Sequence, residues 1–155
     1  MNRLRLLKFA NQLRRAGSIN AHAVAFMLTE MRFRGPLVRA CEILYALWSI
    51  YLLRREPKST LGKCQVSFSY WRQRYGKHNL ALFRAVLDDF ANYQICCDYL
   101  QINQRSNLRE TIICYNGRPS VLYVRLFYEH LDLFNSIVQQ VDGATGVGRA
   151  AKPAA

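Results

Sequence analysis

The side chains that could carry out catalysis or hold a metal ion are scattered along this sequence. His22, His78 and His130 lie far from one another, and no two cysteines form a C-x-x-C pair. A zinc site needs closely spaced ligands, so these spacings do not suit one. The cysteine count is odd, five in all, which argues against a disulfide framework and indicates a reducing compartment.

Acid–base and phosphate chemistry have equally little support. Asp88 and Asp89 are neighbours, and on a helix this spacing points the two carboxylates in different directions. Gly143, Gly146 and Gly148 follow no predicted strand and open no predicted helix, so they do not suit a phosphate-binding loop. The sequence also lacks G-x-S-x-G, Walker and H-E-x-x-H motifs. We therefore expect a protein that is not an enzyme and uses no cofactor, metal or small-molecule substrate.

The chemistry that the residues favour is the binding of a polyanion. The chain carries 22 Lys and Arg against 10 Asp and Glu, which gives a net charge of +12. Residues 57–87 contain six of these cations and no acid. Basic side chains gain free energy by displacing the counterions of nucleic acid, and they are also attracted to anionic membranes. Either class of partner suits this interval.

The elements that position these cations can be predicted from hydrophobic periodicity and turn residues. Helical spacing predicts helices over residues 2–16, 20–33, 37–55, 70–75, 79–93 and 128–141. The helix at 37–55 has the apolar spacing of a buried core helix, and its apolar run is too short to span a membrane. Runs rich in β-forming residues predict a short strand at 65–69 and a three-stranded sheet over 95–102, 111–115 and 121–127. The last helix could also begin as early as Ser120.

The order of these elements resembles a winged helix-turn-helix. The resemblance rests on residues 64–71 as strand and first helix, on 76–79 as the turn and on 82–94 as the recognition helix. Residues 117–126 resemble the wing of such regulators and of plasmid or phage replication proteins. The resemblance covers residues 37–127. It implies an α+β fold that is mainly helical, with a small antiparallel sheet as the wing and helices at both ends of the chain.

The resemblance also implies which residues contact DNA. The second helix of such a motif inserts its N-terminal end into the major groove, which places residues 77–79 and Arg84 near base edges. The complete set expected to bind nucleic acid is Lys63, Arg72, Arg74, Lys77, His78, Asn79, Arg84, Arg105, Arg109 and Arg118. Structural alternatives stay open, since Asn79 can be an N-cap alone and Arg72 and Arg74 can be solvated surface residues.

We therefore predict sequence-specific binding of double-stranded DNA by a cytoplasmic transcription regulator or a mobile-element replication or control protein. The alternative is a basic interaction module that binds RNA, a ribonucleoprotein or an anionic membrane surface through its N-terminal helix. The segment before Glu30 is also rich in Arg and free of acids, which fits a mitochondrial transit peptide as a further alternative.

The predicted organisation has three parts. Residues 1–35 are expected to form a basic helical extension, 36–141 the winged-helix domain and 142–155 a flexible tail. The extension carries an apolar helical face with no place in such a domain, formed by Leu4, Leu7 and Leu13. Because an exposed apolar face normally finds a partner, we expect it to form a homodimer.

Overall fold

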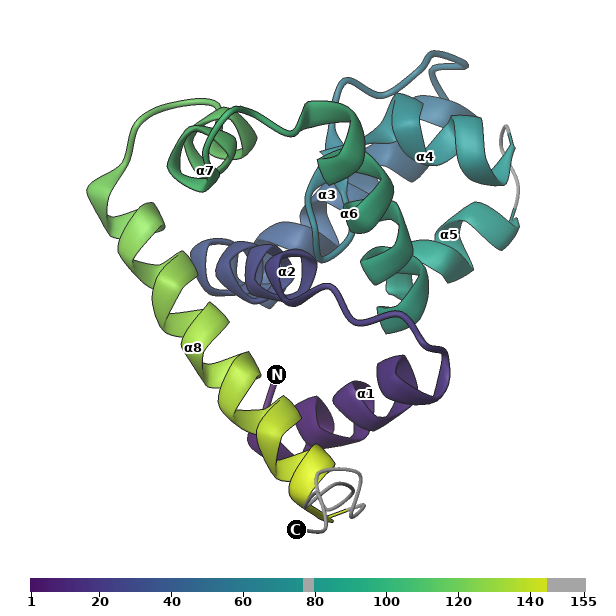
Figure 1. Ribbon diagram of the computed structural model, residues 1–155. Coiled ribbons are helices and arrows are strands. Elements are labelled where there is room, and N and C mark those ends of the chain that lie inside the picture. Colours follow the sequence, from purple (N-terminus) through teal and green to yellow (C-terminus); the bar gives the residue numbers. More distant parts are fainter. Residues whose placement is uncertain (77–79, 145–155) are drawn as a thin grey trace, which may run out of the picture.

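The computed structural model describes residues 1–76 and 80–144, and these residues are mainly helical (Figure 1). The described helices are α1 (Arg3–Arg15), α2 (Ala21–Phe33), α3 (Pro36–Tyr51), α4 (Phe68–Tyr75), α5 (Leu80–Leu87), α6 (Asp89–Asn103), α7 (Leu108–Asn116) and α8 (Val121–Ala144). The described strands are β1 (Thr60–Leu61) and β2 (Val66–Ser67), which pair in antiparallel fashion. The prediction of a mainly helical chain with a small antiparallel sheet is confirmed at this level.

Short polar side chains set where several helices begin. Asn2, Asn20, Asp88 and Asn107 each accept a hydrogen bond from the backbone N–H three residues later. These bonds satisfy N–H groups that the first turn of a helix leaves without a backbone partner. Because Asp88 caps α6 directly after α5, the single helix predicted over residues 79–93 is in fact two helices.

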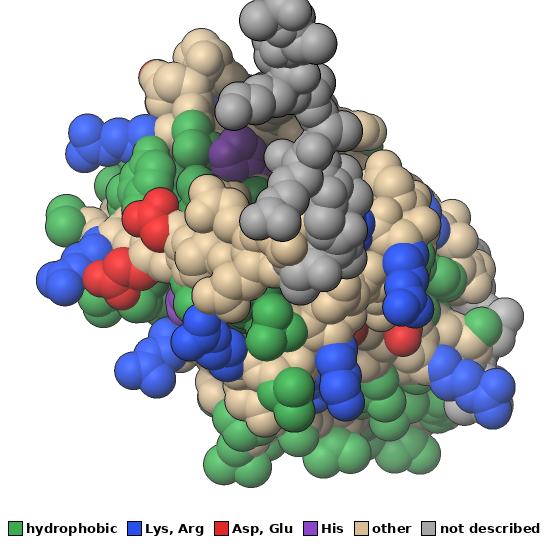
Figure 2. Space-filling view, turned by 60° about the horizontal axis from the view of Figure 1, so that its bottom comes forward, with side chains coloured by type: hydrophobic (Ala, Val, Ile, Leu, Met, Phe, Trp, Pro, Cys, Tyr) green, Lys and Arg blue, Asp and Glu red, His purple; other side chains and the backbone are tan. Residues whose placement is uncertain are grey.

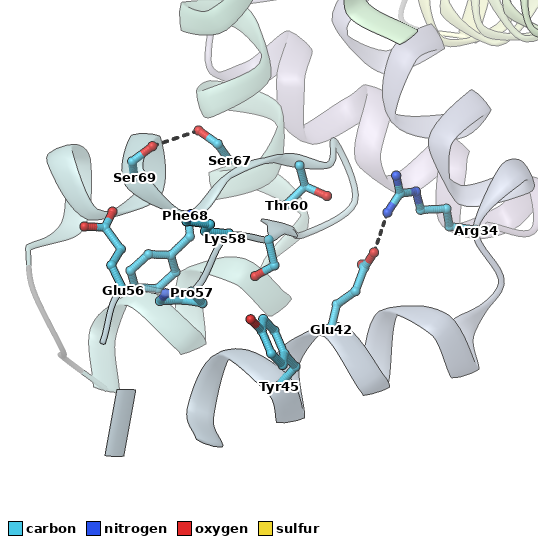
Figure 3. Close-up of a pocket in the computed structure, with 11 residues that line it drawn as sticks. Arg34, Glu42, Tyr45, Glu56, Pro57, Lys58, Thr60, Ser67, Phe68 and Ser69 are labelled. Carbon is cyan, nitrogen blue, oxygen red and sulfur yellow. Dashed lines mark hydrogen bonds and ion pairs between the residues drawn. The ribbon is translucent and has the colours of Figure 1, made fainter. Parts of the chain in front are cut away.

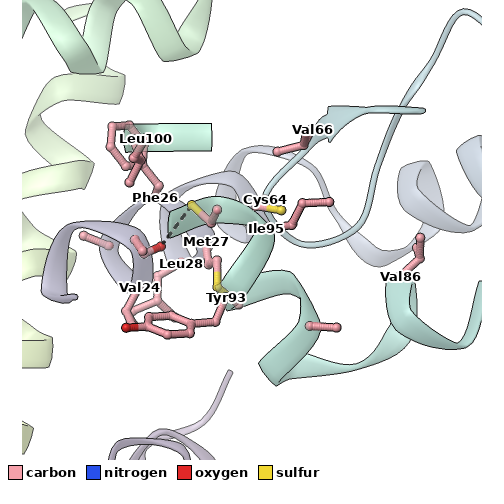
Figure 4. Close-up of a cluster of buried hydrophobic side chains, with 14 of the residues drawn as sticks. Val24, Phe26, Met27, Leu28, Cys64, Val66, Val86, Tyr93, Ile95 and Leu100 are labelled. Carbon is pink, nitrogen blue, oxygen red and sulfur yellow. Dashed lines mark hydrogen bonds between the residues drawn. The ribbon is translucent and has the colours of Figure 1, made fainter. Parts of the chain in front are cut away.

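Helix α2 lies at the centre of the molecule, where it packs against α8 and α6. Every residue from Ala23 to Glu30 is buried. Figure 4 shows the side chains of Phe26 and Met27 close to Ile95 and Leu100 of α6. A helix that is apolar on most sides requires neighbours on most sides, and α2 has them.

Helix α3 was predicted as the core helix, and this prediction is wrong. It buries only Ala46, Ser49 and Ile50 and contacts the rest of the chain mainly at β1. An apolar helix face is usually buried, but the periodicity of its residues does not show whether it is buried by the same chain or by a partner. In this fold α2 takes the central place and α3 lies at the surface.

The apolar face of α1 also differs from the prediction. Its buried residues are Leu6, Phe9, Ala10 and Leu13. Leu4, by contrast, is 63% exposed. Helix α1 packs along α8, and Arg3 reaches Gln140 of that helix with a hydrogen bond of 3.3 Å. Of the face that we expected to join two copies, Leu13 is buried and Leu7 is half-buried by the same chain, and only Leu4 is exposed, so α1 shares one core with the other helices.

The three-stranded sheet predicted over 95–102, 111–115 and 121–127 is also wrong, since these segments lie in α6, α7 and α8. Their β-branched and aromatic residues favour strands, but β-propensity depends strongly on tertiary context. In α6 the buried residues Tyr93, Cys96 and Leu100 recur at helical spacing, so the same residues fit a helix against α2.

The residues assigned to the wing turn have a different role. Gly117 has a φ of +73° and ends α7 in the left-handed conformation that glycine adopts without strain. The Ser120 hydroxyl then accepts a hydrogen bond of 3.2 Å from the backbone N–H of Tyr123, in the first turn of α8. The earlier start of the last helix, which the sequence left open, is therefore confirmed.

A hairpin formed by β1, β2 and their turn is held by side chains from three helices. Trp71 of α4 donates its indole N–H to the Leu61 carbonyl at 3.1 Å, and Tyr115 of α7 donates its hydroxyl to the Cys64 carbonyl. Asn92 of α6 accepts a hydrogen bond of 2.6 Å from the backbone N–H of Lys63. These bonds satisfy backbone groups that the two-residue strands leave unpaired.

The amide of Asn92 also joins α5 to α6. Its Nδ2 donates to the Val86 carbonyl at 2.8 Å and to the Asp88 carbonyl at 2.6 Å. Gly62, in the turn of the hairpin, has a φ of +79°, and a Cβ there would collide with Asn92 and Trp71. The fully buried Asn92 is thus the common support of the hairpin and the α5–α6 junction.

We expect Asn92→Ala to lower the free energy of unfolding by about 2 to 4 kcal/mol, because it leaves several buried backbone groups without a partner. Denaturant unfolding followed by circular dichroism measures the change. Asn135→Ala, at an exposed position of α8, is the control and should change the value by less than about 1 kcal/mol. Equal effects of the two substitutions would contradict the role given to Asn92.

One buried carboxyl lies between α2 and α8. The Tyr123 hydroxyl donates a hydrogen bond of 2.6 Å to Glu30, and both side chains are buried. Burial raises the pKa of Glu30, although the Tyr123 hydrogen bond and nearby Arg34 act in the opposite direction. The folded state therefore binds a proton at Glu30 more readily than the unfolded state does.

This difference predicts a pH dependence. The folded protein holds the Glu30 proton more tightly, so the contribution of Glu30 to stability is complete below pH 4.5 and declines as the pH rises through the raised pKa. Glu30→Gln stays neutral and should lose less stability than the wild type between pH 4.5 and pH 7. Unfolding midpoints across this range test the difference, and parallel pH profiles would exclude it.

Candidate nucleic-acid interface

The two helices of the predicted helix-turn-helix are α4 and α5, and they contact each other. Phe68 and Trp71 of α4 and Leu82 and Val86 of α5 are buried, so the two helices pack through apolar side chains. Arg84 lies on the outward side of α5 and is exposed. Lys77, His78 and Asn79, which we expected near base edges, fall outside the described residues.

Three predicted cations of the interface are held in ion pairs. Arg72 pairs with Glu56, Arg74 with Asp98 and Lys63 with Asp89. The interval 57–87 has no acid of its own, but folding brings acids to it from residue 56, from the N-terminal turn of α6 and from the middle of α6. The charge of an interval in sequence therefore overstates the positive charge of the surface that it forms.

Lys63 has the most unusual electrostatic surroundings of these cations. Asp89 also binds Arg5, whose Nη2 lies 2.7 Å from the carboxylate. Burial, together with the positive charges of Arg5 and Arg39, lowers the pKa of Lys63 to about 8, whereas Asp88 acts in the opposite direction. Lys63 thus supports a local network more than it presents a free charge to a ligand.

The arginines expected in the wing lie elsewhere. Arg105, Arg109 and Arg118 are exposed, and they lie in α7 or beside it. Figure 1 shows α7 and α5 on opposite sides of α6. Arg105 donates a weak hydrogen bond of 3.5 Å to the Cys114 sulfur within the same region. The structure therefore does not bring these three arginines to the α4–α5 pair.

The exposed basic side chains do not form one dense patch. In Figure 2, Lys and Arg side chains are spread over the visible face, with few acidic ones between them. Arg84 has no ion-pair partner among the described residues. It is the one predicted contact on the described part of the helix pair that is both exposed and unpaired.

A groove of about 830 Å³ lies between α3 and the start of α4 (Figure 3). At one end Arg34 forms an ion pair with Glu42, which also accepts a hydrogen bond of 3.1 Å from Gln65. Tyr45 and Phe68 line the middle of the groove. Its lining also includes the hydroxyl groups of Ser59, Thr60, Ser67 and Ser69 and the charged side chains of Glu56 and Lys58.

Comparisons with protein-family models, with curated proteins and with solved structures find no match to this chain. Function is therefore inferred from the arrangement of its own residues.

Residues 1–76 and 80–144 contain neither a metal-ligating cluster nor a helix that could span a membrane. No group of three or more His, Cys, Asp or Glu in this part of the chain could hold a metal ion. No helix in it combines the length and the apolar character that crossing a membrane requires.

The structure also presents a feature that the sequence did not assign to a site. Helix α3 carries large apolar side chains at the surface: Leu37 is 76% exposed, Leu44 63% and Trp48 50%. Their helical spacing is visible in the sequence, but the same spacing is typical of a buried core face. Arg54, Arg55 and Lys58 follow α3 and are exposed as well.

The surroundings of Lys63 generate a prediction. Arg39→Gln removes a like charge near Lys63, so the Lys63 pKa should rise from about 8 toward its ordinary value of 10.5. NMR titration of the Lys63 side-chain carbon resonances measures this change. Arg54→Gln, which removes a charge outside this cluster, should leave the value unaltered. A Lys63 pKa that stays the same in both variants would show that Arg39 does not contribute to its lowered value.

Proposed function

We propose that this chain binds double-stranded DNA through the α4–α5 helix pair, with Arg84 directed toward the major groove. The observation that carries the proposal is the position of Arg84, which is exposed, has no ion-pair partner among the described residues and lies on a helix whose opposite side is packed into the protein. A guanidinium in this position can donate two hydrogen bonds to a guanine. Residues 77–79 precede α5 directly in the sequence, at the end that would enter the groove.

The ion pairs of α4 are compatible with a supporting role on the DNA backbone. Arg74 and Asp98 are both partly exposed, as are Arg72 and Glu56. Exposed ion pairs contribute only about 0 to 1 kcal/mol each, so a phosphate can replace the carboxylate as partner. The net charge of +12 favours the approach to DNA, and binding should weaken steeply with salt.

The proposed mode differs from a winged helix-turn-helix in one respect. The segments expected to form the wing are helices, so we propose a helix-turn-helix that acts without a strand wing. A cytoplasmic regulator or a replication protein of a mobile element could use such a reader. No surface is assigned to the homodimer expected with it, because Leu13 of the expected face is buried, Leu7 is half-buried and only Leu4 is exposed.

The RNA or membrane alternative through the N-terminal helix has less support. Membrane binding by an amphipathic helix requires a free apolar face. Leu6, Phe9 and Leu13 of α1 are buried in the core of the protein. This helix therefore presents mainly its basic side to a partner.

The test compares two exposed arginines. Fluorescence anisotropy with a duplex enriched from a random pool and with a scrambled duplex should show preferential binding by the wild type. Arg84→Ala should reduce this preference about 10- to 100-fold, since a bidentate base contact gives about 1 to 3 kcal/mol of discrimination. Arg118→Ala is the matched control, and it should change either affinity by less than about twofold because Arg118 lies near α7.

Two results would overturn the proposal. The first is the absence of duplex binding even at low salt. The second is an equal loss of discrimination between the two duplexes in Arg84→Ala and Arg118→Ala, which would exclude the α4–α5 pair as the DNA-recognition element.

A further inference from the structure

Helix α3 presents a continuous apolar stripe to solvent. Leu37, Leu44, Trp48 and Tyr51 are separated by seven, four and three residues, a spacing that places them on one side of the helix. All four are at least 50% exposed. From Leu37 to Tyr51 the stripe extends over roughly 21 Å, at 1.5 Å per residue.

Further apolar side chains widen this surface. Val38 and Tyr45 lie beside the stripe on α3, and Leu52 and Leu53 extend it past the end of the helix. Figure 2 shows hydrophobic side chains gathered along the lower edge of the molecule, with basic side chains beside them. Contiguous apolar patches of this kind mark interaction sites on folded proteins.

The C-terminal end of the stripe is positively charged. Arg54, Arg55 and Lys58 follow the last turn of α3 and are exposed, whereas Arg39 lies on the other side of the helix, beside Lys63. The acids close by in sequence are already engaged, because Glu42 binds Arg34 and Glu56 binds Arg72. The rim of the stripe therefore carries a net positive charge.

This rim argues against a second copy as the occupant. In a two-fold pair the same surface meets itself. Parallel helices would bring Arg54 and Arg55 against their own copies, which places like charges together around an apolar contact and opposes association. Antiparallel helices would leave these arginines without an acidic partner from α3 of the other copy or from the segment after it, because Glu42 and Glu56 are already engaged.

The same arrangement suits an anionic lipid surface. Leucine side chains can enter the acyl region, Trp and Tyr are favoured at the level of the headgroups, and Arg side chains bind lipid phosphates. Attraction to an anionic leaflet adds about 1 kcal/mol for each basic residue near the surface. A helix of 16 residues that lies flat in the interface satisfies these conditions without crossing the bilayer.

We propose that the exposed face of α3 binds the surface of an anionic lipid membrane. This activity goes beyond the proposed DNA binding, since it uses α3 and not the α4–α5 pair.

The two tryptophans of the chain provide a direct test. Trp48 is 50% exposed on the stripe, whereas Trp71 is fully buried and donates its indole N–H to the Leu61 carbonyl. Vesicles of phosphatidylcholine with phosphatidylserine should shift the emission of the full chain to shorter wavelength. Vesicles of phosphatidylcholine alone should cause a much smaller shift. In Trp48→Phe the shift should vanish while co-sedimentation with anionic vesicles persists.

Variants locate the binding surface. Leu44→Glu should weaken binding to anionic vesicles at least tenfold, because it places a carboxylate in the stripe. Leu122→Glu is the matched control, since Leu122 of α8 is similarly exposed, at 59% against 63% for Leu44, and it should bind like the wild type. Arg54→Gln combined with Arg55→Gln should weaken binding about 5-fold per residue. Circular dichroism checks that each variant is folded.

Several outcomes would overturn the proposal. One is the absence of an emission shift with anionic vesicles, and another is equal weakening by Leu44→Glu and Leu122→Glu. A dimer in sedimentation that Leu44→Glu dissociates, without vesicle binding by the wild type, would assign the stripe to a second copy. Duplex binding measured on the same samples separates these failures from a failure of the DNA proposal.

Discussion

The buried amide of Asn92 is the interaction on which the rest of the structure depends. It holds the hairpin turn at Lys63 and the carbonyl groups at the end of α5, so two segments remote in sequence share one support. The hairpin in turn contacts α3, α4 and α6. The proposed DNA-binding helices and the exposed apolar helix are therefore positioned by one small polar group, which can do this because nearly all of its hydrogen-bonding capacity is used in the interior.

Ion pairs also join elements that are remote in sequence. Asp89 joins Lys63 of the hairpin to Arg5 of α1, and Asp98 joins α6 to Arg74 of α4. Several of the ten acids thus connect separate elements instead of neutralising cations near them in sequence. The excess of positive charge is left at helix ends and on exposed faces, where a polyanion or an anionic surface can meet it.

Much of the helical framework could be predicted from the sequence, because its signals are local. Asn2 and Asn20 cap the first two helices where the sequence placed them, and Ser120 precedes α8. The helical structure of residues 95–127 could not be predicted in this way, since residues such as Ile95, Cys96 and Leu100 favour a helix only through packing against α2. The candidate site was predicted only in part. Arg84 is exposed on α5, whereas the pairing of Arg72 and Arg74 depends on acids that only the folded chain brings near.

The attachment of α3 through the hairpin has a consequence for how the protein opens. Helix α2 is enclosed by other helices, so its amide hydrogens become accessible only when most of the fold is lost. Helix α3 buries only a few residues and contacts the body mainly at β1. Its amides should therefore exchange with solvent through a separate, local opening of low free energy, which makes α3 the part of the molecule that a bound partner would protect most.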